Sequence, residues 1–259
     1  MKASFALPIL IICILLTNSC ATTPETDEDH LWRAVRSGDH AEVKRLIGTG
    51  VDVNAGGGEK WTVLMVAAAN GHTEVARLLI EAGADVHAKT EVKDISRARR
   101  YGGWTPLLLA ARNGHTETIK LLIETGADID AQNNMGWTAL MIAIMEGDND
   151  TFRVLIEEGA DVNAQDEFGR TALMIASMEG HTDIARLLIE GGADLDIRLS
   201  SVDDYTALMI ACNWENRDIV KLLVEAGADV NIRTKLGLRG VNRKGRKILE
   251  EVLEETGTK

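Results

Sequence analysis

The chain has 259 residues, of which 45% are hydrophobic and 26% charged, so it holds enough apolar side chains to bury a core without disulfide staples. Its 40 acidic and 28 basic residues give a net charge of −12 at pH 7. Such an acidic chain is repelled by phosphate backbones, which argues against general nucleic-acid binding.

The first expected element is a targeting segment over residues 1–19. Lys2 precedes an apolar run from Phe5 to Leu16, and a short polar stretch leads to Cys20. A run of this length is too short for a bilayer, which takes about 20 residues, so a signal peptide is expected. The ending resembles a bacterial lipoprotein signal, which implies acylation of Cys20, although Thr17 stands where such signals usually carry leucine. Plain secretion and an uncleaved anchor remain alternatives.

A polar linker over residues 20–30 is expected to lead into a repeat domain over residues 31–259. One phrase recurs in it five times: Thr-x-Leu, then Gly (Glu in the last copy) nine residues later, then Gly-Ala-Asp twelve residues further on. The copies begin at Thr62, Thr105, Thr138, Thr171 and Thr206 and close on Gly83, Gly126, Gly159, Gly192 and Gly227. Repeats of constant internal spacing are typical of a stacked solenoid.

The residues of one copy predict a helix pair. Thr105 is a suitable N-cap with proline at the first helical position, and a short apolar helix follows. Thr116 is expected to cap a second helix, which Gly126 ends. The first helices are expected near Thr62–Ala69, Thr105–Arg112, Thr138–Met145, Thr171–Met178 and Thr206–Asn213.

These segments resemble ankyrin repeats, as the stretch from Thr105 to Ala131 shows most fully. The resemblance implies an all-α solenoid of stacked helix pairs with β-hairpin-like finger loops. It divides the domain into an N-terminal cap repeat over residues 31–55, five full repeats over about 58–231 and a C-terminal cap over 232–259. Within that cap, a last short helix is expected over Ile248 to Glu255.

The connectors between copies vary in length while the copies do not. From the closing Gly to the next Thr the chain takes 12 residues in three cases, 14 before Thr206 and 22 before Thr105. The longest connector predicts an elongated finger around Lys89 to Gly103. This finger is basic over residues 89–100, as is the run over residues 233–247. Both are interpreted as solvated loops, with docking to an acidic partner or to anionic lipid headgroups as the alternative.

Residues that suggest chemistry fall within the repeat pattern. His72, His115 and His181 each follow the glycine between two helices, where ankyrin repeats use histidine to hold the turn. The Asp of each Gly-Ala-Asp is expected to bond its own backbone in a turn. Cys212 is expected to be a small buried apolar residue. The sequence therefore predicts no enzyme, no cofactor and no metal site.

The resemblance also indicates where a partner would bind. Ankyrin repeats hold partners through the residue before the helix-starting Thr, through finger tips and through the exposed end of the first helix. Carried over, these positions are Trp61, Tyr101, Trp104, Arg112, Trp137, Met145, Glu146, Phe168, Arg170, Met178, Glu179, Tyr205 and Trp214. Aromatic and Met side chains are enriched in interfaces. In the alternative, a Trp before the Thr packs on the neighbouring finger.

The expected function is that of a monomeric adaptor, exported and lipid-anchored at Cys20 in the bacterial envelope, facing the periplasm or the cell surface. Its concave face would bind a protein partner. Glu146 and Glu179 at the rim of that face predict a partner with apolar side chains flanked by basic ones. A secreted effector that acts on host proteins and a purely structural envelope protein are the alternatives.

Overall fold

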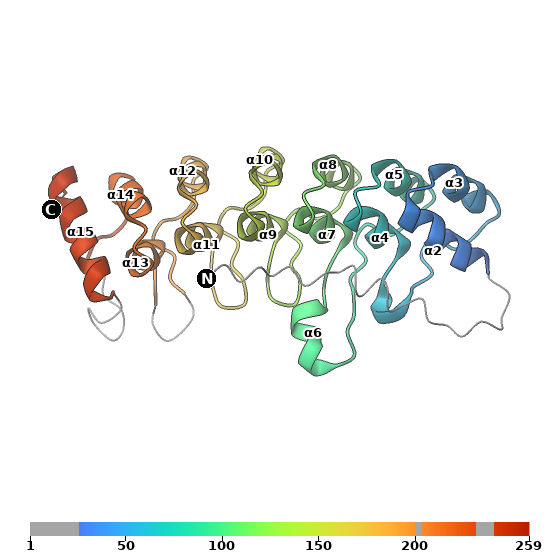
Figure 1. Ribbon diagram of the computed structural model, residues 1–259, viewed down its shortest axis with the longest axis horizontal. Coiled ribbons are helices and arrows are strands. Elements are labelled where there is room, and N and C mark those ends of the chain that lie inside the picture. The colour runs from blue at the N-terminus through green and yellow to red at the C-terminus, as the bar shows by residue number, and fades with distance from the viewer. Residues whose placement is uncertain (1–25, 200–203, 232–240, 259) are drawn as a thin grey trace.

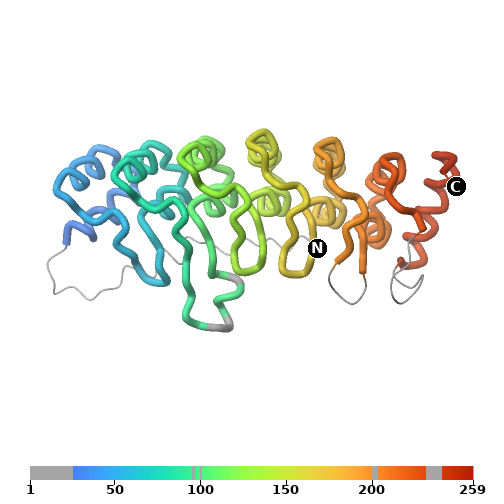
Figure 2. The backbone as a smooth tube through the Cα atoms, turned by 180° about the vertical axis from the view of Figure 1, so that it is seen from behind, coloured from blue at the N-terminus to red at the C-terminus, as the bar shows by residue number. Residues whose placement is uncertain are grey.

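The computed structural model describes residues 26–199, 204–231 and 241–258, and this part of the chain is a stack of helix pairs (Figure 1). The inner helices are α4 (Val63–Ala69), α7 (Pro106–Arg112), α9 (Ala139–Glu146), α11 (Ala172–Glu179) and α13 (Ala207–Asn213). Their outer partners are α5 (Thr73–Glu81), α8 (Thr116–Glu124), α10 (Asn149–Glu157), α12 (Thr182–Glu190) and α14 (Arg217–Glu225). The finger loops lie on the side of the inner helices that faces away from the outer ones, as Figure 2 also shows. The predicted all-α solenoid is confirmed.

Each inner helix begins one residue after the threonine of its repeat. The threonine hydroxyl accepts a hydrogen bond of 3.2–3.4 Å from the backbone N–H three residues on, at Met65, Leu108, Met141, Met174 and Met209. The predicted N-caps and first helices are thereby confirmed. The expected cap of the second helix is wrong by one residue, since Thr116 is the first residue of α8 and His115 is its N-cap.

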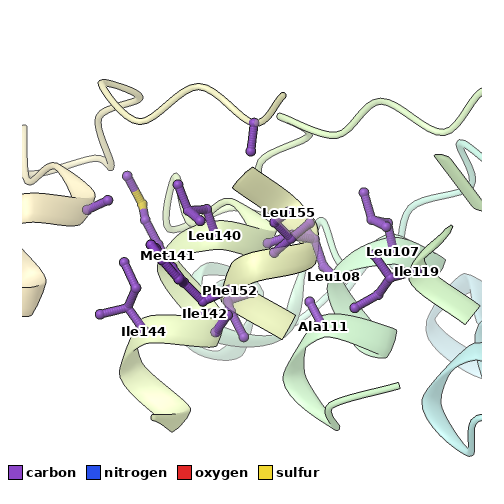
Figure 3. Packing of buried hydrophobic residues seen from close by; sticks show 14 of the residues in the cluster. Leu107, Leu108, Ala111, Ile119, Leu140, Met141, Ile142, Ile144, Phe152 and Leu155 are labelled. Carbon is purple, nitrogen blue, oxygen red and sulfur yellow. The ribbon is translucent and has the colours of Figure 1, made fainter. Parts of the chain in front are cut away.

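The core is a continuous layer between the helix pairs. Because the inner helices have neighbours on several sides, nearly all their side chains are buried, whereas the outer helices bury only one stripe. Figure 3 shows this layer around α7 and α9, where Leu108 and Met141 pack near Phe152. Short helices are marginal alone, so each pair depends on the repeats beside it.

The two ends of the stack differ from the expected boundaries. Helix α2 (Asp27–Ser37) begins four residues before the expected start at residue 31, because Thr26 and Asp29 form a reciprocal capping box. It pairs with α3 (His40–Gly48) as the N-terminal cap repeat.

At the other end, α15 (Arg243–Thr256) is longer than the expected Ile248 to Glu255. The basic residues from Arg243 to Lys247 are therefore helical and not a loop, because Asn242 caps the helix before them. The earlier part of the basic run, over residues 233–240, lies outside the described residues, as do the expected signal segment over residues 1–19 and Cys20. Across the described ranges, no helix is long and apolar enough to cross a membrane.

Candidate protein-binding face

The finger tips are joined to one another by backbone hydrogen bonds. Glu91 donates to the carbonyl of Glu59 (2.9 Å), Asn134 to that of Gly102 (3.1 Å) and Glu167 to that of Met135 (3.2 Å). The fingers therefore form a row along the solenoid, and side chains at equivalent positions lie on neighbouring fingers. The expected elongated finger is present and carries its own short helix, α6 (Ile95–Tyr101) (Figure 1).

Two of the expected binding tryptophans belong to the core. Trp61 and Trp104 are 6% and 7% exposed. The Arg112 guanidinium lies 5.3 Å from the centre of the Trp104 ring and adds to its cover. These two side chains therefore offer a partner little surface, and the packing alternative describes their position.

The corresponding residues of the next repeats, Trp137, Arg170 and Tyr205, are half-buried. The backbone N–H of Trp137 donates to the Asn133 side-chain oxygen (3.0 Å), while its buried indole N–H has no acceptor among the described residues. Arg170 forms a 2.7 Å ion pair with the buried Asp166. These contacts fix the bases of the fingers that carry Trp137 and Arg170.

Phe168 is the most exposed aromatic residue among the expected finger-tip positions, at 43%. Arg99 and Arg170 place their guanidinium groups 5.1 and 5.2 Å from the centre of its ring. Tyr101, on α6, is half-buried and lies under Arg97 at 5.5 Å. Arginine stacked on an aromatic face is a favourable contact, so Phe168 is held in place although it is exposed.

The ends of the inner helices form a second row. Helices α9, α11 and α13 contact one another in sequence. Met145 and Met178 occupy the same position on α9 and α11 and are half-buried against the core. The next position holds the exposed Glu146 and Glu179 and, at the end of α13, Trp214, which is 55% exposed. This row therefore combines apolar and acidic groups.

The two carboxylates of that row lie at the C-terminal ends of their helices. Glu146 and Glu179 are the last residues of α9 and α11, where the helix dipole disfavours negative charge. Within the described part of the chain, neither forms an ion pair. The outer helices α5, α8, α10, α12 and α14 also end in glutamate, so Glu146 and Glu179 are set apart only by their place beside Met145, Met178 and Trp214.

The structure thus narrows the expected site. Apart from the half-buried Tyr101 and Arg112, the accessible members of the predicted set lie from the third full repeat onward, and we call these the binding face: Trp137, Met145, Glu146, Phe168, Arg170, Met178, Glu179, Tyr205 and Trp214. Tyr101 and Arg112 lie at its edge, and Trp61 and Trp104 lie beneath the surface. Sequence reasoning did not show that Trp61 and Trp104 are buried while Trp137 is half-buried, and partner binding at these positions stays a prediction.

Two of the three turn histidines, His72 and His115, connect neighbouring repeats. The Nε2 atoms of His72 and His115 lie 3.2 and 3.1 Å from the carbonyl oxygens of Arg36 and Ala69 in the preceding repeat. At the last junction the Asn216 amide donates to the carbonyl of Ser177 (2.7 Å). Among the described residues, no three His, Cys, Asp or Glu side chains are grouped as metal ligands.

Cys212 is a buried free cysteine, as predicted. Burial raises the pKa of its thiol to about 12, so the thiolate that would act as a nucleophile is scarce at neutral pH.

Comparison with known proteins agrees with the geometry. The family described as "Ankyrin repeats (3 copies)" matches residues 3–90, 91–166 and 145–234. Two curated proteins named mitochondrial disaggregase, from Bos taurus and Homo sapiens, are each 39% identical to the chain over 71 residues. That segment is 27% of this chain and 10% of each relative, so the chain spans only about a tenth of the length of the relatives it matches.

Proposed function

Because the chain belongs to the ankyrin-repeat family, whose stacked repeats act as protein-interaction scaffolds, we propose that it is an adaptor that binds a protein partner through the binding face. The observation that carries the proposal is the row at the ends of α9, α11 and α13, where the exposed Glu146 and Glu179 follow half-buried methionines and the exposed Trp214 takes the equivalent position. The disaggregase activity of the two relatives is not part of the proposal, because the match covers a tenth of their length.

The chemistry of the face defines the partner. Phe168 and Trp214 are large apolar side chains of the kind that anchor interfaces, and Met145 and Met178 can adapt to the shape of a partner. Glu146 and Glu179 occupy one position on contacting helices, whose axes in such packing lie about 8–10 Å apart. A segment with apolar side chains and two basic groups at a matching separation fits this face. Its association should be fast at low salt and slow at high salt.

Charge reversal tests the proposal. The double variant Glu146→Lys/Glu179→Lys should lose capture of the partner from envelope extracts at low salt. The matched control is Glu157→Lys/Glu190→Lys, which makes the same charge change at the exposed ends of the outer helices α10 and α12. Equal loss in both variants would attribute capture to net charge and not to the face.

We further propose that the protein is exported and held at a membrane of the bacterial envelope by acylation of Cys20. The support is the sequence of the first 20 residues, with its apolar run and Ser-Cys ending. Stable anchoring takes two acyl chains or a second membrane signal, since one chain binds marginally. Cys20→Ala should move the protein from the membrane fraction to the soluble fraction and change its mass. Unchanged partitioning and mass would refute lipidation.

A secreted effector that uses the same face on host proteins is the second candidate, and a purely structural envelope protein is the third. Recovery of the protein in the culture medium, with the face still required for capture, would favour the effector. No enzymatic activity is proposed, because the polar residues that suggested chemistry serve turns and contacts between repeats.

A further inference from the structure

The inserted finger, over residues 89–103, contacts the finger before it and the two fingers after it. Its helix α6 sits beyond the tips of the other fingers, on the side away from the helix pairs (Figures 1 and 2). The basic residues of this finger, interpreted from sequence as solvated or as a docking site, include two arginines that pair with acidic residues of other fingers.

The first set of contacts joins the inserted finger to the preceding one. Arg97 of α6 lies 3.3 Å from the Glu59 carboxylate, and Lys60 lies 2.5 Å from that of Glu91. The backbone N–H of Glu91 donates to the Glu59 carbonyl at 2.9 Å. Two oppositely directed ion pairs and one backbone bond therefore connect these two fingers.

The second set passes over the third finger. There the Asn134 side-chain amide donates to the Ala98 carbonyl of α6 (2.9 Å), and the Asn134 backbone N–H donates to the Gly102 carbonyl (3.1 Å). The approach is close, since a side chain at Gly102 would place its Cβ 2.3 Å from the Asn134 amide nitrogen and 2.6 Å from the Ala98 carbonyl oxygen. Glycine is therefore required where α6 meets the third finger.

The third set reaches the fourth finger. The Nε atom of Arg99 donates to both Glu167 oxygens at 2.9 and 3.0 Å, and its terminal nitrogen lies 2.8 Å from one of them. The same guanidinium lies over the Phe168 ring. Such a forked pair fixes direction as well as distance. One side chain of α6 thus positions a residue 69 places further along the chain, which no other connector in the described ranges does.

We propose that α6 is an electrostatic brace, which holds the first four fingers at fixed spacing and positions Phe168 on the binding face. Its ionic contacts are exposed, so each is weak and is screened by salt. Finger spacing should therefore loosen as ionic strength rises. A braced face is ordered before it meets a partner, which lowers the entropic cost of binding. The brace itself lies wholly within the chain and does not depend on the proposed function.

Hydrogen exchange of the free, full-length protein tests the brace. The readout is exchange of peptides over residues 132–137 and 165–170, which contain the tip N–H groups of Asn134 and Glu167. Arg99→Glu should speed their exchange by about threefold, as expected for loss of one exposed pair, with α10 and α12 unchanged. The reversed pair Arg99→Glu/Glu167→Arg should restore protection.

The matched control is Arg77→Glu, which makes the same charge change in an exposed pair with Glu74 on the outer helix α5. It should leave the finger peptides unchanged. In the unmodified protein, raising NaCl from 0.05 to 0.5 M should speed their exchange, and in Arg99→Glu it should have a smaller effect. Equal finger exchange in Arg99→Glu and Arg77→Glu, or no recovery in the reversed pair, would overturn the proposal.

Discussion

Single residues at one position link each repeat to the next. Asn54, Asp130, Asn163 and Asp196 each accept a hydrogen bond of 2.8–2.9 Å from the backbone N–H of the Gly-Ala-Asp aspartate that follows in the next repeat. Amide and carboxylate oxygens serve equally as acceptors. Asparagine and aspartate differ in charge at this position, because a carboxylate acceptor lies close to the aspartates of the neighbouring turns.

Asp130 shows the cost of that charge. Burial raises the pKa of its carboxyl group and Asp161 and Asp128 raise it further, while the bond from the Asp161 N–H lowers it in part. A carboxyl pKa raised by folding means that the folded state binds the proton more tightly. The resulting stability is present below the unfolded pKa near 3.8 and is lost as pH rises through the folded value.

Asp130→Asn should therefore stabilise the protein at pH 7, by up to about 0.5 kcal/mol as expected for a surface site, and have no effect at pH 3.5. Asn163 shows that an amide oxygen makes the same bond. Thermal unfolding at the two pH values is the measurement. A lower melting temperature at pH 7, or a gain that is larger at pH 3.5, would contradict this explanation.

For single residues, the helix caps could be predicted from the sequence, and the burial of side chains could not. The threonine caps follow from the residues beside them, since the hydroxyl bonds a backbone three residues away. Trp61 and Trp137 occupy equivalent positions in two repeats, yet the first is buried and the second half-buried. Their exposure depends on the neighbouring finger and helix end, which the sequence of one repeat does not contain.

One junction between repeats lacks the hydrogen bond that joins the Gly-Ala-Asp turns at the other described junctions. His87 occupies the position of the acceptors described above, and among the described residues the Asp128 N–H donates no hydrogen bond to the repeat before it. A cavity of about 60 Å³ lies at this junction, with Val86, His87, Thr105 and Asp128 among its lining residues. The contact between the first and second full repeats is therefore less complete than the others.

Replacing His87 with Asn should supply the missing acceptor. We expect His87→Asn to stabilise the fold by about 0.5–1 kcal/mol, the value of one net hydrogen bond. Asn163→His should lower stability by a similar amount and serves as the reciprocal control. Melting temperatures of both variants decide the matter. A lower value for His87→Asn would show that the histidine makes the better junction.

The C-terminal helix depends on one glycine. A Cβ at Gly245 would lie 2.4 Å from the Cys212 carbonyl oxygen, so α15 packs directly on the backbone of α13. The sequence placed a helix here but gave no sign of this contact, because Cys212 and Gly245 are far apart along the chain. Helix α6 was missed for the same reason, since its anchoring pair Arg99–Glu167 joins the second finger to the fourth.

Gly245→Ala should lower stability by about 1–3 kcal/mol, the usual cost of overpacking, although alanine is worth up to about 1 kcal/mol more than glycine in a helix. The control is Gly48→Ala at the end of α3, where a Cβ would meet no atom within 4 Å. That variant should be neutral or more stable. The free energies of unfolding of both variants are measured by urea denaturation. A higher value for Gly245→Ala than for Gly48→Ala would contradict the packing argument.

The whole molecule is a linear stack with two unlike sides. The outer helices expose charged residues, whereas the opposite side carries the finger row and the ends of the inner helices (Figure 1). The five-fold phrase predicted this architecture because repeats of constant spacing have few ways to stack. The face could be outlined from the same register, but its limits came from the burial of Trp61 and Trp104.

Photo-crosslinking tests the central claim, that the binding face holds a protein partner. A benzophenone amino acid at position 168 or 214 should give one discrete adduct in cells, and the same group at Arg186 on the outer helix α12 should give none. The adduct should disappear with Glu146→Lys/Glu179→Lys and persist with Glu157→Lys/Glu190→Lys. An adduct formed from position 186 alone, or one at 168 and 214 that survives reversal of Glu146 and Glu179, would contradict the account.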